Sequence, residues 1–369
     1  MSLNCGIVGL PNVGKSTLFQ ALTSAPAEAA NYPFCTIDPN VGIVNVPDRR
    51  LEEITKRIPT EKVVPAVCEF VDIAGLVRGA SRGEGLGNKF LANIRETGVI
   101  LHVVRCFDNN DIIHVENKID PRNDIEIINL ELALADLDTV EKRYEKNIRV
   151  AKAKGTEAGK IAEAQQAVLE KLRPALENGA PVRSVPLTED EVDLIRDLHL
   201  ITAKKVLYVC NVDEAGLSSE NDYVKKTAEI AAAENADYVV ICGKLESEIA
   251  ALDTPEERAE FLDAAGLTES GLDRLIQKSY ALLGLRTFFT AGPKEVRAWT
   301  FKEGYKAPQA AGVIHSDFER GFIKADIYTC DDLFQYGSEA AVRQAGKLRT
   351  EGREYIVRDG DIVFFKFNV

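Results

Sequence analysis

The sequence predicts an α/β fold in which a mostly parallel sheet is interrupted by a helical arm and followed by a mixed β module. Val, Ile and Leu dominate several short runs that alternate with helical segments, which is typical of a parallel sheet covered on both faces. Residues 124–178 instead repeat apolar positions every three or four residues, as long helices do. From residue 285 onward, short aromatic and β-branched segments are separated by turn residues.

Length and composition fit a globular chain of two or three domains. The 369 residues are 45% hydrophobic and 28% charged, and the formal net charge of −13 argues against a protein that coats nucleic acid non-specifically. The apolar start has no basic leader and is broken by Pro11, Asn12 and Lys15, so we expect neither a signal peptide nor a membrane span. The seven cysteines are scattered without a Cys-x-x-Cys pair, which favours core positions in a reducing cytoplasm.

The predicted strands of the parallel sheet begin at the N-terminus. The first strand ends at Val8 and is followed by a glycine-rich turn and a helix over 18–23. Five later runs of Val, Ile and Leu are predicted as further strands, over 41–46, 67–73, 99–107, 205–210 and 238–242. Ligands of α/β proteins bind at the carboxyl ends of such strands, so residues that follow them are candidate site residues.

The helical arm interrupts the alternation of strands and helices. The apolar spacing of residues 124–178 predicts two antiparallel helices that meet at a turn marked by Gly155 and Gly159. A shorter helix is predicted to begin at Thr188, because Glu191 completes a capping box. We therefore expect three parts: an α/β domain of residues 1–123 and 204–284, an inserted arm of residues 124–203, and a C-terminal module of residues 285–369.

The C-terminal module is predicted to be a compact mixed β structure. Its strand signals lie over 286–290, 295–300, 321–328 and 354–367. The last segment contains Asp359-Gly360, a dipeptide that favours a tight β-hairpin.

A phosphate-binding loop is predicted between the first strand and the first helix. Residues 9–16 read Gly-Leu-Pro-Asn-Val-Gly-Lys-Ser, which matches G-x-x-x-x-G-K-[ST]. Lys15 would place its charge between the β- and γ-phosphates as a catalytic group, and the Ser16 hydroxyl would bind Mg²⁺. Backbone N–H groups that we expect to converge on the phosphate oxygens belong to Asn12, Val13, Gly14, Lys15, Ser16 and Thr17.

Two further segments supply candidate metal ligands and a contact to the γ-phosphate. The predicted strand over 67–73 leads into Asp72-Ile-Ala-Gly75. Asp72 can hold the metal through water, and Gly75 can offer its backbone N–H to the γ-phosphate as a further catalytic group. Thr36 precedes another strand and supplies either a second hydroxyl to the metal or a plain surface hydroxyl.

These motifs together resemble the translation-factor-related P-loop GTPases and, among them, the Obg-related YchF family, also called Obg-like ATPases. The resemblance covers essentially the whole chain: the phosphate-binding loop, the Asp72-Ile-Ala-Gly-Leu-Val-Arg-Gly-Ala segment, the arm, and a C-terminal module that looks like a β-grasp TGS domain. It implies a P-loop NTPase that hydrolyses a nucleotide and associates with the ribosome, with the large subunit as the expected partner.

The choice of base depends on the residues after the strand at 205–210. GTPases of this class read guanine with Asn-Lys-x-Asp, whose Asp accepts hydrogen bonds from two ring donors that adenine lacks. Here the sequence is Asn211-Val-Asp-Glu214, so a longer carboxylate replaces the Asp. A site built around a hydrogen bond rejects a base that leaves the bond unmade. The resemblance carries the same departure and implies ATP, with Asn211 on the adenine. GTP as the substrate, and Glu214 as a solvated turn residue, are the alternatives.

The residue that positions the attacking water is not obvious. Many relatives use a Gln directly after Asp-x-x-Gly, but Leu76 occupies this place and has neither donor nor acceptor. We therefore expect hydrolysis to be slow or to be completed by another residue or a partner. His114 follows a polar loop at the carboxyl end of a strand, so it is our candidate for orienting the water, with a surface histidine as the alternative. His102 lies inside an apolar run and is expected in the core.

The arm and the C-terminal module are the predicted partner surfaces. Nine Lys and Arg against five Asp and Glu lie between positions 141 and 173 of an otherwise acidic chain. These cations either contact RNA phosphates or cover a solvated helix face; the candidates are Lys142, Arg143, Lys146 and Arg149. The TGS-like module implies RNA or ribosomal protein, and no membrane partner is expected. A ribosome-binding or RNA-binding adaptor with a structural nucleotide and negligible turnover stays open beside the ATPase and the GTPase.

Overall fold

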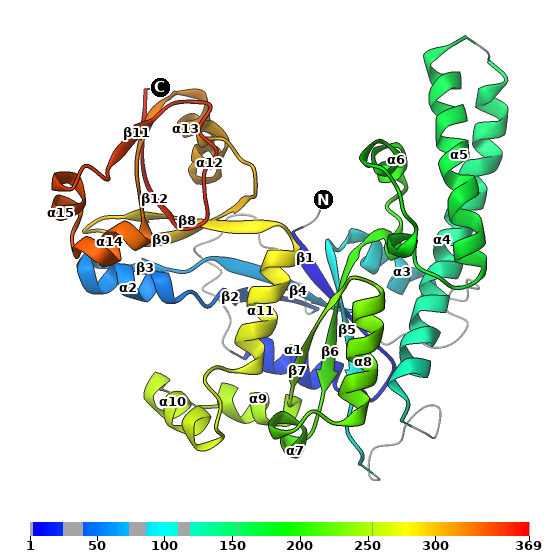
Figure 1. The fold of residues 1–369 in the computed structure, drawn as a ribbon, viewed down its shortest axis with the longest axis horizontal. Coiled ribbons are helices and arrows are strands. Elements are labelled where there is room, and N and C mark those ends of the chain that lie inside the picture. Colours follow the sequence, from blue (N-terminus) through cyan, green and yellow to red (C-terminus); the bar gives the residue numbers. More distant parts are fainter. Residues whose placement is uncertain are drawn as a thin grey trace. The chain divides into compact units, whose positions relative to one another are not determined.

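The computed structural model describes residues 3–24, 40–73, 86–109, 119–153, 155–252 and 254–368 (Figure 1). Their contacts divide the chain into two units. Unit 1 contains the described residues up to 24, together with 40–42 and 69–275. Unit 2 contains residues 43–68 and the described residues from 276 onward.

The sheet that contains β1 has the predicted α/β character. Its strands are β1 (Asn4–Val8), β2 (Val41–Asn45), β4 (Val67–Asp72), β5 (Val99–Arg105), β6 (Lys205–Asn211) and β7 (Asp237–Ile241). They lie in the order β2-β4-β1-β5-β6-β7, and β1 pairs in parallel with both β4 and β5. The pairs β5–β6 and β6–β7 are also parallel. Every residue of β5 is buried, which explains its continuous apolar run.

Helices connect these strands and cover them. They are α1 (Lys15–Thr23), α3 (Leu86–Glu96), α7 (Glu214–Ser218), α8 (Asp222–Ala233), α9 (Gly243–Ala250), α10 (Pro255–Ala264) and α11 (Gly271–Leu282). Helix α1 packs against α9, while α8 packs against β6 and β7. The two helices that follow β1 and β7 are therefore neighbours, and this arrangement brings together the loops from which they start.

The arm consists of two long helices, α4 (Pro121–Ala151) and α5 (Glu157–Glu177), that extend side by side away from the sheet (Figure 1). The predicted turn is only partly correct. Gly155 lies in it with a φ of +86°. Gly159, however, is a buried residue of α5, and its N–H donates to the Oγ1 of the N-cap Thr156. The predicted capping box of Thr188 and Glu191 begins α6 (Glu189–Ile195).

Unit 2 is built on a mixed sheet with the order β11-β10-β12-β8-β9-β3. Its strands are β3 (Val63–Val64), β8 (Leu285–Ala291), β9 (Val296–Lys302), β10 (Phe322–Thr329), β11 (Arg349–Glu351) and β12 (Asp361–Phe367). Its helices are α2 (Arg49–Arg57), α12 (Ala307–Ile314), α13 (Ser316–Arg320), α14 (Cys330–Tyr336) and α15 (Glu339–Gln344). Phe288, Phe301 and Phe365 pack with α12 in the core between sheet and helix.

The hairpin predicted at Asp359-Gly360 is wrong. Strand β12 begins directly after this dipeptide and pairs with β10 and β8. Instead of closing a hairpin, the dipeptide contacts β8: Thr287 N donates to Asp359 Oδ1 at 2.8 Å, and Gly360 N donates to Thr287 O at 2.9 Å. Local turn preference is overridden here because a distant strand supplies the hydrogen-bond partners.

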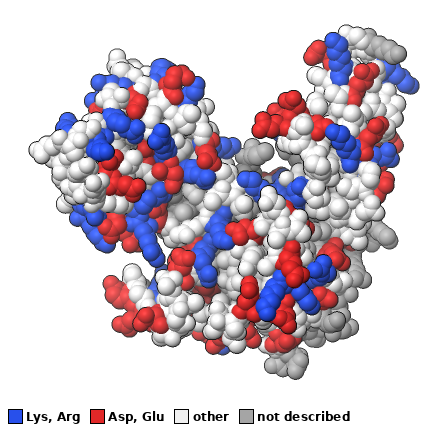
Figure 2. Space-filling model, in the orientation of Figure 1, with Lys and Arg blue, Asp and Glu red and all other residues white. Residues whose placement is uncertain are grey.

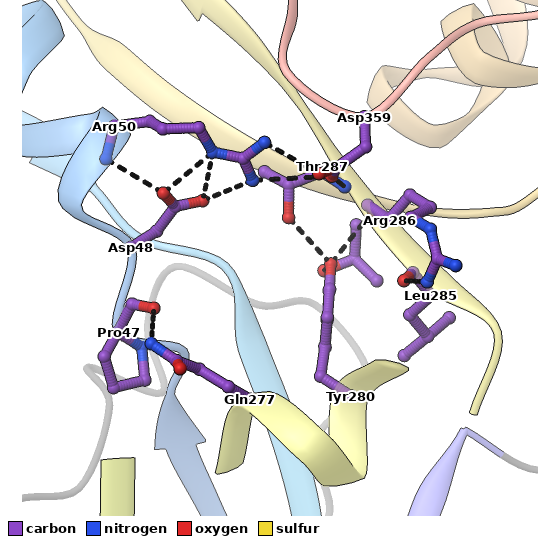
Figure 3. Close-up of polar contacts among 10 residues, drawn as sticks. Pro47, Asp48, Arg50, Gln277, Tyr280, Leu285, Arg286, Thr287 and Asp359 are labelled. Atoms are coloured by element: carbon purple, nitrogen blue, oxygen red, sulfur yellow. Dashed lines mark hydrogen bonds and ion pairs between the residues drawn. The ribbon is translucent and has the colours of Figure 1, made fainter. Parts of the chain in front are cut away.

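Residues 43–68 group with the C-terminal residues rather than with the α/β domain in which they were expected. Strand β3 pairs in parallel with β9. Arg50 binds Asp48 at 2.8 Å and Asp359 at 2.7 Å, and Gln277 donates to Pro47 O (Figure 3). Unit 2 is therefore assembled from two parts of the chain that are more than 200 residues apart.

Core positions follow the prediction from composition. Six cysteines are free and buried, while Cys35 lies outside the described residues. His102 is 2% exposed, and its ring centroid lies 5.4 Å from that of Tyr208, so the prediction of a core histidine is confirmed. Among the described residues, no helix has the length and apolar character needed to cross a membrane.

Candidate nucleotide-binding site

The candidate site residues gather at one edge of the sheet that contains β1. Because β1, β4, β5, β6 and β7 run in parallel, their carboxyl ends lie at the same edge. The phosphate-binding loop follows β1, Asp72 ends β4, and Asn211 ends β6. In the sheet register, Asp72 is directly opposite Ile7, one residue before the end of β1.

The phosphate-binding loop depends on two glycines for its shape. A Cβ on Gly9 would lie 2.5 Å from Val103 O, so no side chain fits against β5. Gly14 has a φ of +99°, and a Cβ there would lie 2.2 Å from Asn211 Nδ2. Helix α1 starts at Lys15 with no side-chain cap, and its first turn carries no acidic residue. Its first N–H groups and the exposed Ser16 and Thr17 hydroxyls are therefore available to an anion.

Lys15 lies inside this loop. Its side chain is buried, and Nζ donates to Leu10 O at 2.7 Å. Burial lowers the pKa of Lys15 to about 8, and the Asp72 carboxylate offsets part of this shift. A phosphate next to Nζ would add to the partial counter-charge that Asp72 supplies.

Asp72 and Ser16 offer oxygen ligands that suit a magnesium ion. Burial raises the pKa of Asp72, and the Lys15 charge opposes that rise only in part. A nearby divalent cation would stabilise such a carboxylate. Within the described ranges, His, Cys, Asp and Glu side chains form no group of three that could hold a metal. An ion bound beside Asp72 and Ser16 would have phosphate oxygens among its ligands, as magnesium commonly does.

Asn211 ties the loops of the site to one another. Its Nδ2 donates to Val13 O at 2.9 Å, and its Oδ1 accepts from Gly243 N at 3.0 Å. The side chain thus joins the phosphate-binding loop to the start of α9. Contact of Asn211 with the base stays a prediction; its two contacts in the structure give it a positioning role that the motif did not reveal.

Glu214 is the first residue of α7, and its carboxylate has a definite partner. Glu214 Oε1 accepts from Lys244 Nζ at 2.9 Å, and both side chains are exposed. Lys244 follows Gly243, the residue that Asn211 contacts. An exposed ion pair thus joins Glu214 to Lys244 at the start of α9, and contact of Glu214 with a base stays a prediction.

Arg105 is a buried charge at the carboxyl end of β5 that sequence reasoning did not single out. It ends β5, is fully buried, and donates from Nε to Phe107 O at 3.2 Å and from Nη2 to Asn109 O at 2.9 Å. Burial lowers the pKa of Arg105. The guanidinium thus holds the loop that leaves β5. An arginine that closes a run of Val and Ile was the available signal, because such a charge is seldom buried without partners.

Several predicted site residues lie outside the described part of the chain. They are Thr36, Gly75, Leu76 and His114. In the structure, Asn211 contacts the phosphate-binding loop, Asp72 is near enough to Lys15 to affect its pKa, and Glu214 pairs with Lys244. Their joint role in binding a nucleotide stays a prediction.

The basic residues of the arm differ in what they contact. Arg143 Nη1 lies 2.7 Å from Asp197 Oδ2 and donates to Gln165 Oε1, so its charge is used within the arm. Lys142 pairs with Asp138 on the surface. Lys146 and Arg149 are exposed, and Figure 2 shows basic and acidic side chains interspersed along the arm. Of the four candidates, Arg143 is thus the least suited to contact RNA.

Two family models match separate parts of the chain. A model described as 50S ribosome-binding GTPase matches residues 4–142. The YchF-GTPase C-terminal model, described as a protein of unknown function, matches residues 285–368.

Several relatives match along their whole length. Proteins named Ribosome-binding ATPase YchF from Bacillus subtilis (strain 168) and Escherichia coli O157:H7 are 57% and 54% identical to this chain, and the alignments cover 100% of each sequence. A solved structure of the YchF GTPase from Schizosaccharomyces pombe superimposes with a TM-score of 0.88 at 40% identity, covering 99% of this chain and 98% of that one. This similarity confirms the predicted P-loop α/β fold with its C-terminal domain.

Proposed function

This chain belongs to the YchF family, and from that premise we propose that it is a Mg²⁺-dependent ATPase that hydrolyses ATP to ADP and phosphate and binds the ribosome. Relatives named ribosome-binding ATPases support this proposal over their full length. We further propose the large subunit as the ribosomal partner and the cytoplasm as the location.

The observation that carries the proposal is the buried Lys15 inside a glycine loop that opens α1. A lysine with a lowered pKa beside uncapped helix N–H groups is a site for a polyanion. Asn211, at the end of β6, contacts the phosphate-binding loop, and Glu214 begins the next helix, which supports placing the base beside these two residues. The Asn-x-x-Glu sequence supports ATP rather than GTP, because guanine recognition in this class depends on Asp.

Hydrolysis in this proposal is an in-line attack of water on the γ-phosphorus, with ADP as the leaving group. Lys15 and the loop amides stabilise charge on the transferred phosphoryl group, together with the Gly75 N–H. Ser16, Asp72 and Thr36 would hold Mg²⁺, which would supply neutralising charge when bound. His114 orients the water, and the absence of a Gln at Leu76 makes intrinsic turnover slow.

Titration of the chain with labelled ATP and GTP at equal Mg²⁺ tests the nucleotide. We expect ATP to bind more tightly, and tighter binding of GTP would contradict the proposal. Measurement of ATP hydrolysis with and without ribosomes tests whether the chain is an enzyme. Hydrolysis that is unmeasurable in both conditions would favour an adaptor with a structural nucleotide.

The partner surfaces are the arm and the C-terminal module. We propose that the exposed Lys146 and Arg149 contact RNA phosphates, with Lys142 contributing at the edge of the same surface. The three-part organisation stays part of the proposal, with residues 43–68 and 276–284 moved to the C-terminal part because they group with it. The nucleotide-binding domain then keeps the other residues of 1–123 and 204–284, the arm is residues 124–203, and the TGS-like β-grasp domain built on residues 285–369 binds RNA or ribosomal protein.

A further inference from the structure

Lys244 is a charged residue of the site that the proposed mechanism does not use. Its Nζ lies 2.9 Å from Glu214 Oε1 and 3.9 Å from Glu248 Oε1. The hydrogen bond to Glu214 is the main reason why the pKa of Lys244 is raised. Glu214 is thus the nearer and stronger partner of this ammonium.

The position of this pair follows from Asn211. The Asn211 side chain fastens Val13 on one side and Gly243 on the other. Lys244 is the next residue after Gly243, and Glu214 begins the helix that follows Asn211. The ion pair therefore joins the start of α7 to the start of α9, close to the side chain that fastens the phosphate-binding loop. In the proposed binding mode, the base lies beside this pair.

The chemistry of the two purines makes this pair relevant to base choice. Guanine presents the donors N1–H and N2–H₂, which a free carboxylate accepts together. Adenine has no donor at N1 and no amino group at position 2. A carboxylate already bound to an ammonium is less available to guanine, because the guanine donors then compete with Lys244 for its oxygens.

We propose that Lys244 is a specificity-determining residue, which disfavours GTP by holding the Glu214 carboxylate in an ion pair. The inference rests on the proposed ATP preference and explains how a carboxylate can occupy the guanine-reading position without restoring guanine binding. Lys244 is a positioning residue in this scheme, since it acts on the base through Glu214.

The test uses the full chain and its equilibrium affinities for ATP, GTP and ITP at equal Mg²⁺. In Lys244→Met we expect the ratio of GTP to ATP affinity to rise about two- to fivefold, the upper part of the range for one exposed ion pair. ITP lacks the 2-amino group, so its gain should be smaller than that of GTP. Adding Glu214→Gln to Lys244→Met should cancel the gain, because no carboxylate remains.

Two matched controls separate this effect from a general loss of positive charge. Lys225→Met removes a lysine in an exposed ion pair on α8, and Glu248→Gln removes the more distant carboxylate near Lys244. Neither control variant should change the ratio of GTP to ATP affinity. An unchanged ratio in Lys244→Met, or an equal fall in affinity for all three nucleotides, would overturn the inference. A wild-type preference for GTP would instead refute the proposed base choice before any variant is compared.

Discussion

Gly14 shows how a single backbone position can be tied to the whole site. Its positive φ favours glycine, and a Cβ would collide with the amide of Asn211. Asn211 in turn holds Val13 and Gly243. The shape of the phosphate-binding loop is therefore maintained by a side chain almost 200 residues away.

We predict that Gly14→Ala lowers ATP affinity at least about a hundredfold, because the new methyl group displaces Asn211 and leaves buried N–H and C=O groups unpaired. Gly266→Ala is the matched control: its φ is +70°, but no atom lies within 4 Å of the added Cβ. Equilibrium binding of labelled ATP measures the effect. Wild-type affinity in Gly14→Ala would contradict the role given to Asn211.

The burial of His102 predicts that the free energy of unfolding decreases in acid. Burial lowers the pKa of His102 from 6.5 to about 3, so the folded chain does not take up the proton that the unfolded chain binds below pH 6.5. The contribution of neutral His102 to the free energy of unfolding is fully present above pH 6.5 and decreases as the pH drops toward 3. At pH 5 the loss is about 2 kcal/mol.

We expect His102→Leu to remove this part of the acid sensitivity. Chemical denaturation at pH 7.5 and pH 5.0, followed by circular dichroism, measures the difference between the two proteins. An identical loss of stability in wild type and variant would show that His102 is not the group responsible.

At the scale of elements, the arm combines a sequence-predictable framework with contacts that the spacing does not reveal. Its helices follow the apolar repeat, and Leu169, Leu172 and Leu176 lie in the arm's core. Arg143, by contrast, turns toward Gln165 and Asp197. Helical spacing gives the face of a residue, but it does not show which third element covers that face.

The exposed cations Lys146 and Arg149 lead to a prediction about the affinity of the chain for ribosomes. Replacing Lys146 and Arg149 by Glu should weaken ribosome binding and reduce the slope of log affinity against log salt by about two, since each lost phosphate contact removes roughly one unit. Lys225→Glu with Lys226→Glu on α8 changes the net charge equally, so it serves as the control. Co-sedimentation over a salt series measures both. Equal weakening by the two double variants would place the contact elsewhere.

At the scale of the whole molecule, unit 2 depends on residues from the first quarter of the chain. Arg57 lies over the Phe334 ring at 4.9 Å, and Arg50 bridges Asp48 to Asp359 (Figure 3). Val64 is almost fully buried in β3 at the edge of the sheet. A C-terminal fragment without these residues would expose apolar surface and leave Asp359 without its cation.

We therefore predict that a fragment of residues 285–369 is much less stable than the same region in the full chain. Adding a peptide of residues 43–68 should raise its melting temperature, because the peptide restores α2 and β3. Thermal unfolding with and without the peptide, against a scrambled peptide, measures this. A fragment as stable alone as in the full chain would contradict the two-part assembly.

The sequence by itself determined the features that depend on neighbours along the chain: the phosphate-binding loop between β1 and α1, the Val-rich strands, the long arm helices and the capping box at Thr188. Periodicity and short motifs encode these, because the interactions lie within a few residues. Tertiary structure alone decided the partners of Asn211, the inward turn of Arg143, the failure of Asp359-Gly360 to form a hairpin, and the grouping of residues 43–68 with the C-terminal sheet. Each of those outcomes joins residues far apart in sequence, and local preference carries no information about which distant group will supply a hydrogen bond or an opposite charge.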